Sequence, residues 1–264
     1  MSDTVLIEEM TWADVRAALD RGIRTAVMAC GAVEQHGPHL PTGVDTYLGT
    51  AIAVRAARRA GNALVAPTLR PALSEHHMGF PGSFTVRPET FVALLEDCCE
   101  SLARQGFERI VVFASHGGNI DTMRAHVPPI ARRLGGRAEL ILASVIAGQA
   151  GDAVRAYLEE RGIARGRAGA HAGYSETSMM LAERADLVDM GRAEPGRCDE
   201  DFYRPENLAA SQMESFLQGI QSQSHNGILG DPTGAKAEDG DRLLDLAAEI
   251  LAREVAGQRE GSLR

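Results

Sequence analysis

Short apolar runs alternate with longer amphipathic segments along most of this 264-residue chain. Continuous apolar runs are typical of strands buried on both faces, whereas apolar residues spaced three and four apart indicate a helix. The runs predict strands at residues 25–30, 62–69, 108–115 and 139–146. The amphipathic segments predict helices at residues 45–60, 88–106, 119–134, 152–161, 175–184 and 238–255, with Trp12 in a further helix near the start.

This alternation favours an α/β fold in which a mostly parallel sheet carries helices on both faces. Pro128 and Pro129 are expected to kink or restart the helix at 119–134, because proline removes a helical hydrogen bond. No repeat, linker or shift in composition divides the chain, so we expect one domain over residues 1–264. Residues 192–230 hold scattered prolines and glycines and are expected to be irregular, as a lid or a subunit contact.

Composition narrows the class of protein. Apolar residues make up 44% of the chain, which is enough for a full core. The 27 basic and 36 acidic residues give a net charge of −9, which disfavours nucleic acid as a partner. The four cysteines match neither a zinc motif nor a CxxC pair. No signal peptide and no apolar run long enough for a membrane is evident, so we expect a soluble cytoplasmic protein with no membrane partner.

Polar clusters follow the predicted strands. They are GAVEQHGPHLPTGVD at 31–45, SEHHMGFPGSFT at 74–85, SHGGN at 115–119 and HAGYSETS at 171–178. Six of the eight histidines lie in them, namely His36, His39, His76, His77, His116 and His171. Ligand sites in doubly wound sheets form beyond the carboxyl ends of the strands, so we expect these clusters to meet there.

The residue types in these clusters indicate a metal centre. Glu34 and His36 are two residues apart, so an extended segment would present both on one side. Asp45 follows after a bend that Gly and Pro residues impose. Carboxylate and imidazole ligands without thiolate suit Zn²⁺, Mn²⁺ or Fe²⁺, and a carboxylate can bridge two ions about 3.5–4 Å apart.

Each candidate also has an ordinary structural interpretation. Asp45 stands where a helix N-cap is expected, and Glu176 lies in a first helical turn, where a carboxylate is favoured in any case. Asn119 is a candidate cap for the next helix. Glu75, His76 and His77 are either ligands themselves or hold the ligands in place from behind.

The motifs EQHGPHLPTGVD, EHHMGFPGSFT, SHGGN, HAGYSETS and GILGDPTGAKAEDG together resemble those of the creatininase family of metal-dependent amidohydrolases. The resemblance runs from about residue 10 to 255. It implies a three-layer α/β/α fold, two divalent metal ions per subunit and a homohexamer. Members of this family open cyclic amides such as creatinine, deformylate formamidopyrimidines or trim a short peptide precursor.

Carried over by motif, Glu34, His36, Asp45 and His116 match metal ligands, with Asp45 as the bridge. Creatinine-cleaving members carry a ligand glutamate two residues after the strand-end histidine, where this chain has Gly118. Glu176 is therefore the candidate for the fifth ligand and for a catalytic role. His171 matches a histidine that acts on the substrate or leaving group.

Substrate contacts and supporting residues are also expected. Expected substrate contacts are Ser115, Gly117, Gly118 and Tyr174, and expected supporting residues behind the ligands are His39, Glu75 and His76. Creatinine-cleaving members enclose their substrate with tryptophans, and this chain has only Trp12. Creatinine is therefore not the expected substrate.

We hypothesise that a metal-activated water hydrolyses a C–N bond in a small cyclic amide, amide or formamide, and that His171 protonates the leaving nitrogen. Trimming of a short peptide precursor and deformylation of a formamidopyrimidine are the alternatives within the enzyme class. Outside it, the same residues would serve a purely structural role or a module that binds metal and senses a small ligand.

Overall fold

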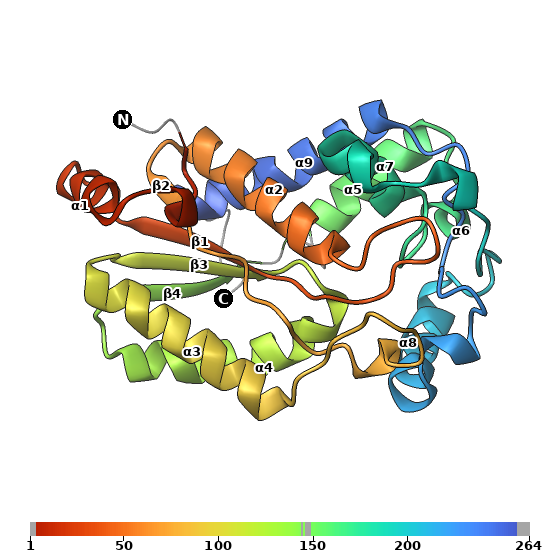
Figure 1. Cartoon of the computed structure of the whole chain (residues 1–264), viewed down its shortest axis with the longest axis horizontal. Coiled ribbons are helices and arrows are strands. Elements are labelled where there is room, and N and C mark those ends of the chain that lie inside the picture. The colour runs from red at the N-terminus through yellow and green to blue at the C-terminus, as the bar shows by residue number, and fades with distance from the viewer. Residues whose placement is uncertain (1–3, 144, 146–148, 258–264) are drawn as a thin grey trace.

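Four parallel strands form the centre of the molecule (Figure 1). The computed structural model describes residues 4–143, 145 and 149–257. In space the strands run in the order β2-β1-β3-β4, with neighbours paired in parallel. Their bounds are β1 Thr25–Cys30, β2 Ala63–Val65, β3 Arg109–Ala114 and β4 Glu139–Ala143.

Helices cover both faces of this sheet, which confirms the three-layer α/β fold (Figure 1). One face packs against α2, α7 and α9, and the other against α3 and α4. The helices are α1 Trp12–Asp20, α2 Val44–Ala60, α3 Pro88–Gln105, α4 Ile120–Leu134, α5 Gln149–Glu160, α6 Arg165–Ala168, α7 Tyr174–Arg184, α8 Pro205–Gln218 and α9 Ala237–Val255. Two 3₁₀ turns matter for the site, η2 Glu75–His77 and η3 Gly117–Asn119.

The alternation of side chains along each strand divides the core in two. Val27 and Ala29 of β1 point toward α2 and α9, whereas Ala26 and Met28 point toward α3 and α4. Because successive strand residues face opposite sides, a strand buried on both faces must be apolar throughout. All six residues of β1 are buried, as the continuous apolar run predicts.

Three predicted features differ in the structure. The second strand spans only 63–65, because an extra residue then shifts its register: Ala66 N–H donates to Val27, and the next bond to β1 comes from Leu69 N–H to Ala29. Helix α4 continues through Pro128 and Pro129 without a break. The carbonyls that lose their partners there belong to the exposed Arg124 and Ala125, where water is available.

The interval 192–230, predicted to be irregular, contains the fourteen-residue helix α8. Proline at the first position suits a helix start, and Gly219 ends it with φ of 80°. The predicted end of the fourth strand at 144–146 falls partly outside the described residues, and the helix predicted to begin at residue 152 begins at Gln149. Among the described residues, no helix is long and apolar enough to cross a membrane.

Candidate metal centre

The predicted ligands meet beyond the carboxyl ends of β1 and β3. Glu34 and His36 lie on the segment after β1, and His116 lies two residues after β3. The backbone N–H of Glu34 donates to the carbonyl of Thr42 at 2.8 Å, which folds this segment back toward the start of α2. Asp45 is the second residue of α2. The N-cap of α2 is Gly43, so Asp45 is not the capping residue.

Two groups of ligand atoms share the Asp45 carboxylate. The first contains Glu34, Asp45 and His116, and the second contains His36, Asp45 and Glu176, with the ligand atoms of each group within 4.8 Å of one another. His116 Nδ1 is 3.4 Å from Asp45 Oδ2, whereas His36 Nε2 is 3.6 Å from Asp45 Oδ1. Each oxygen of Asp45 therefore faces a different group.

Backbone carbonyls fix the orientation of the imidazole rings. His36 Nδ1 lies 3.1 Å from the carbonyl of Glu34, His116 Nε2 lies 3.0 Å from that of Leu73, and His171 Nε2 lies 2.7 Å from that of Gln35. A nitrogen facing a carbonyl must carry a proton, so in the neutral ring the other nitrogen presents its lone pair. In all three rings that second nitrogen points toward the carboxylates, as second-shell bonds to metal ligands require.

The cluster is buried, and the charges of its carboxylates act strongly on the pKa values of its histidines. Glu34, His36, Asp45 and His116 are all nearly inaccessible to solvent. Burial alone would lower the pKa of His36, but the charges of Asp45, Glu176 and Glu34 outweigh it and raise the pKa to about 9. The pKa of His116 is raised well above its ordinary value by Glu34 and Asp45, also against burial. The buried carboxylates of Glu34 and Asp45, with the half-buried Glu176, thus call for positive charge, which either protons or a metal ion supplies.

Several buried polar atoms of the cluster have no hydrogen-bond partner among the described residues. They are Glu34 Oε2, His36 Nε2 and Asp45 Oδ2. Buried polar atoms are ordinarily paired, and an unpaired one costs free energy. Divalent cations accept such oxygens and imidazole nitrogens as ligands, so the residues fit a metal centre.

Glu176 reaches the second group from α7. It is the third residue of this helix, and its Oε2 accepts the N–H of Ala172 at 2.5 Å and lies 3.8 Å from His36 Nε2. Ala172 has φ of 52°, the one positive value among the described non-glycine residues. This conformation costs free energy and persists only where surrounding contacts impose it. It directs the amide of Ala172 at the carboxylate.

Gly118 has no room for a side chain. A Cβ atom there would lie 2.3 Å from the carbonyl oxygen of Leu73 and 2.4 Å from His116 Nε2. The glutamate expected at this position from creatinine-cleaving relatives therefore does not fit the backbone of this chain. Gly117, its neighbour, is exposed, and a Cβ atom there would have no other heavy atom within 4 Å.

His77 lies behind Glu34. Its Nε2 is 3.3 Å from Glu34 Oε1, and its Nδ1 is 3.0 Å from the side-chain nitrogen of Gln35. The side-chain oxygen of Gln35 accepts from Gly37, so its nitrogen is the donor and His77 Nδ1 the acceptor. His77 Nε2 then carries the proton and faces the Glu34 carboxylate. Sequence reasoning considered His77 and overlooked Gln35, which no motif chemistry singles out.

Asn119 does not cap α4 with its side chain. Its amide nitrogen instead donates to the carbonyls of Cys30 and Gly31, both at 3.0 Å, and its oxygen accepts from the N–H of Leu73 at 3.3 Å. This buried residue ties the ends of two strands to the segment that leads into η2. The only feature of the sequence that points to this role is the position of Asn119 directly after SHGG.

Other predicted site residues lie farther back. The Ser115 hydroxyl donates to the backbone carbonyl of Asp45 at 2.8 Å, and that of Tyr174 donates to Asp239 at 2.6 Å. Neither hydroxyl is directed at the cluster.

His39 is buried with Nε2 2.9 Å from Thr177 Oγ1, and Glu75 is exposed. His76 stacks on His116 with ring centroids 5.8 Å apart.

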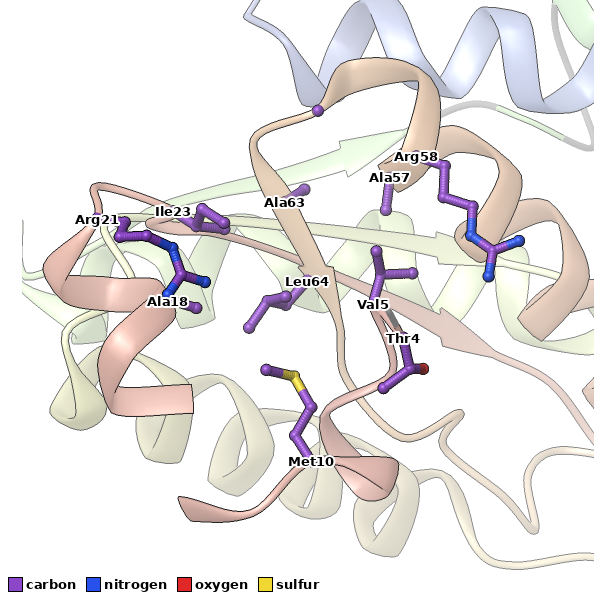
Figure 2. A pocket seen from close by; sticks show the side chains of 11 residues that line it. Thr4, Val5, Met10, Ala18, Arg21, Ile23, Ala57, Arg58, Ala63 and Leu64 are labelled. Atoms are coloured by element: carbon purple, nitrogen blue, oxygen red, sulfur yellow. The ribbon is translucent and has the colours of Figure 1, made fainter. Parts of the chain in front are cut away.

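A separate cavity of about 560 Å³ lies at the opposite, amino ends of the strands (Figure 2). Its lining contains Thr4, Val5, Met10, Ala18, Arg21, Ile23, Ala57, Arg58, Gly61, Ala63 and Leu64. Figure 2 shows Arg21 and Arg58 on opposite sides of this hollow. The lining holds no carboxylate and no imidazole, so it offers none of the chemistry of the metal centre.

Taken together, the fold and the site define an α/β protein with a buried carboxylate–imidazole centre at the carboxyl ends of its strands. The sequence model of one family, creatininase, described as creatinine amidohydrolase, matches residues 8–255. The chain belongs to the creatininase family, whose members are amidohydrolases acting on C–N bonds. This confirms the family that the motifs indicated.

Individual relatives agree with this assignment. The chain is 32% identical over 219 residues to the mycofactocin precursor peptide peptidase of Mycolicibacterium smegmatis, covering 81% of this chain and 77% of that protein. It is 32% identical over 201 residues to creatinine amidohydrolase of Pseudomonas putida, covering 73% and 76%. A crystal structure of creatinine amidohydrolase superposes with a TM-score of 0.79 at 26% identity, covering 99% and 100%. Related structures are described as Mn and Zn–Zn types of creatininase.

Proposed function

We propose that this chain hydrolyses a C–N bond in an amide, lactam or formamide, using a water activated at a centre of two divalent ions. The observation that carries the proposal is the shared carboxylate, because Asp45 turns one oxygen to each ligand group. A carboxylate in this position suits two ions about 3.5–4 Å apart. The Mn and Zn–Zn types among the solved relatives support the same class of ion.

In this proposal Glu34, Asp45 and His116 hold one ion, and His36, Asp45 and Glu176 hold the other. When bound, the ions would lower the pKa of a water between them and polarise the carbonyl of the substrate. Gly117 is exposed beside His116, where its backbone N–H would meet the oxygen of the substrate.

His171 is the candidate for proton transfer. Its Nε2 is committed to the carbonyl of Gln35, and its Nδ1 is 3.9 Å from Glu34 Oε1. Burial and the charge of His36 hold the pKa of His171 well below its ordinary value, so the ring is neutral at neutral pH. In this role Nδ1 first takes a proton from the attacking water and then delivers it to the leaving nitrogen.

Metal content separates the two ligand groups. Protein stripped of metal and reloaded with Mn²⁺ or Zn²⁺ should hold about two ions per chain. Glu176→Gln should hold about one, because the group around Glu34 remains complete, and should lose at least about 100-fold in turnover. Glu183→Gln on the same helix is the control. Two ions and normal turnover in Glu176→Gln would contradict the assignment.

A second candidate function is trimming of a short peptide. It is favoured by the relative in Mycolicibacterium smegmatis, which is named as a peptide peptidase and covers most of this chain. Creatinine is disfavoured because Trp12, the one tryptophan, is 83% exposed on α1, away from the centre. Turnover of creatinine, a formamide, simple lactams and short peptides by the reloaded protein would rank these substrates.

A further inference from the structure

Helix α8 presents an apolar face to solvent beside the metal centre. Met213, Phe216 and Leu217 are spaced three and four residues apart, so they share one side of the helix, here named the α8 face. Their exposed fractions are 60%, 51% and 77%. Soluble proteins seldom expose several large apolar side chains together unless that surface binds something.

A chain of ring contacts joins this face to the candidate ligands. The ring of Phe216 lies 4.6 Å from that of His76, which lies 5.8 Å from that of His116. His76 also contacts His77, whose ring centroid is 4.2 Å away. One imidazole therefore separates the α8 face from the residues of the metal centre.

The protein holds α8 in this place through its own contacts. α8 packs against η2, the turn that carries His76 and His77 (Figure 1). Phe80, shortly after η2, packs with Phe202, Ile220 and Leu229 on either side of α8 in sequence. The helix is thus built onto the segment that supports Glu34, and its apolar face is left toward solvent.

We propose that Phe216, with Met213 and Leu217, binds an apolar side chain of a peptide substrate near the scissile bond. This inference rests on the proposed C–N hydrolysis and selects the peptide candidate. A small flat heterocycle held at the ions would leave the α8 face uncovered. A peptide extends farther, and the separation of Phe216 from His116 through His76 corresponds to roughly two or three extended residues.

A peptide panel tests this assignment. Hexapeptides that differ at one position, Leu or Phe against Asp or Ser, are incubated with the Mn²⁺-loaded protein, and mass spectrometry identifies the cleaved bond. We expect one position within about three residues of that bond to favour the apolar residue by about 10-fold in kcat/KM. In Phe216→Ala this preference should fall to near unity, chiefly through KM, with metal content unchanged.

Matched variants keep the outcomes apart. Leu217→Ser should weaken the same preference, whereas Trp12→Ala, an equally exposed apolar residue on α1, should not. Amide hydrolysis with no apolar preference, or a preference that survives Phe216→Ala, overturns this inference and leaves the proposed function standing. No hydrolysis of any amide overturns both. A change of oligomeric state in Leu217→Ser, measured by light scattering, would show that a second copy covers the α8 face instead.

Discussion

At the scale of single residues, the orientation of Glu34 depends on His77 and on Gln35, which lies behind His77. Gln35 donates to His77, and His77 in turn lies within 3.3 Å of Glu34. Partners of this kind fix the geometry of metal ligands and are worth a substantial share of the affinity. The two residues are supplied by different segments, 31–43 and η2, that meet only in the folded chain.

Removing Nε2 of His77, the nitrogen that faces Glu34, should weaken metal binding. We expect His77→Asn to lower metal affinity by about 10- to 100-fold, because asparagine is too short to reach Glu34. His77→Gln places an amide nitrogen near the position of Nε2 and should retain most of the affinity. Competition with a chelating dye measures both, and His126→Asn, an exposed histidine on α4, is the control. Equal affinities for Asn and Gln would contradict the donor role.

At the scale of secondary structure elements, the first turn of α7 is anchored to α9. Asp239 accepts the hydroxyls of Tyr174 at 2.6 Å and Tyr157 at 2.8 Å and pairs with Arg161 at 3.0 Å. The two helices approach so closely that a Cβ on Gly240 would overlap the backbone carbonyl of Ser178. This packing places Glu176, two residues after Tyr174, at the metal centre.

The Asp239 carboxylate should make stability depend on pH. Burial would raise its pKa, but the bonds from Tyr174 and Tyr157 and the charge of Arg161 hold the pKa below the ordinary 3.8. A carboxylate with a lowered pKa stabilises the folded state above pH 4 or so, and this contribution is lost as pH falls through the lowered value.

Asp239→Asn should therefore lower the free energy of unfolding at pH 7 by about 1.5–3 kcal/mol, the range for bonds to a charged group. The difference from the unmodified chain should shrink as pH falls below about 4. Urea unfolding of metal-free protein across this range measures it, and Asp20→Asn at the exposed end of α1 is the control. A difference independent of pH would show that the charge of Asp239 is unimportant.

At the scale of the whole molecule, the candidate metal centre connects segments far apart in the chain. Its candidate ligands come from the loop after β1, the start of α2, the end of β3 and the start of α7. Ions held between these segments are bound only by the folded chain, so metal should stabilise the fold.

Chelation should lower the melting temperature. At free metal 100-fold above its dissociation constant the stabilisation is about 2.7 kcal/mol, which corresponds to roughly 5–10 °C for a chain of this size. Calorimetry with EDTA and with added Mn²⁺ measures the shift, and Glu34→Gln should show a smaller shift, because only the group around Glu176 remains complete. A melting temperature unaffected by EDTA in protein shown to lose its metal would argue against a centre that joins these segments.

The sequence by itself determined the layers and brought out most of the candidate ligands. Continuous apolar runs at β1 and β3 specify strands buried on both faces, and the clusters that follow them must meet at one edge of a parallel sheet. Glu34, His36, Asp45 and His116 lie there because each is within a few residues of a strand or helix end. Local pattern suffices for such residues.

Only the tertiary structure decided the rest, because those features depend on contacts between distant segments. Pairing of Gln35 with His77, the bonds of Asn119 and the crowding at Gly118 all join segments that periodicity treats separately. Tyr174 lies in a site motif, yet its hydroxyl donates to Asp239 of α9 and so anchors α7 to that helix. Helix α8 formed in a stretch rich in proline and glycine because those residues stand at its ends, and its contact with η2 sets Phe216 beside the metal centre.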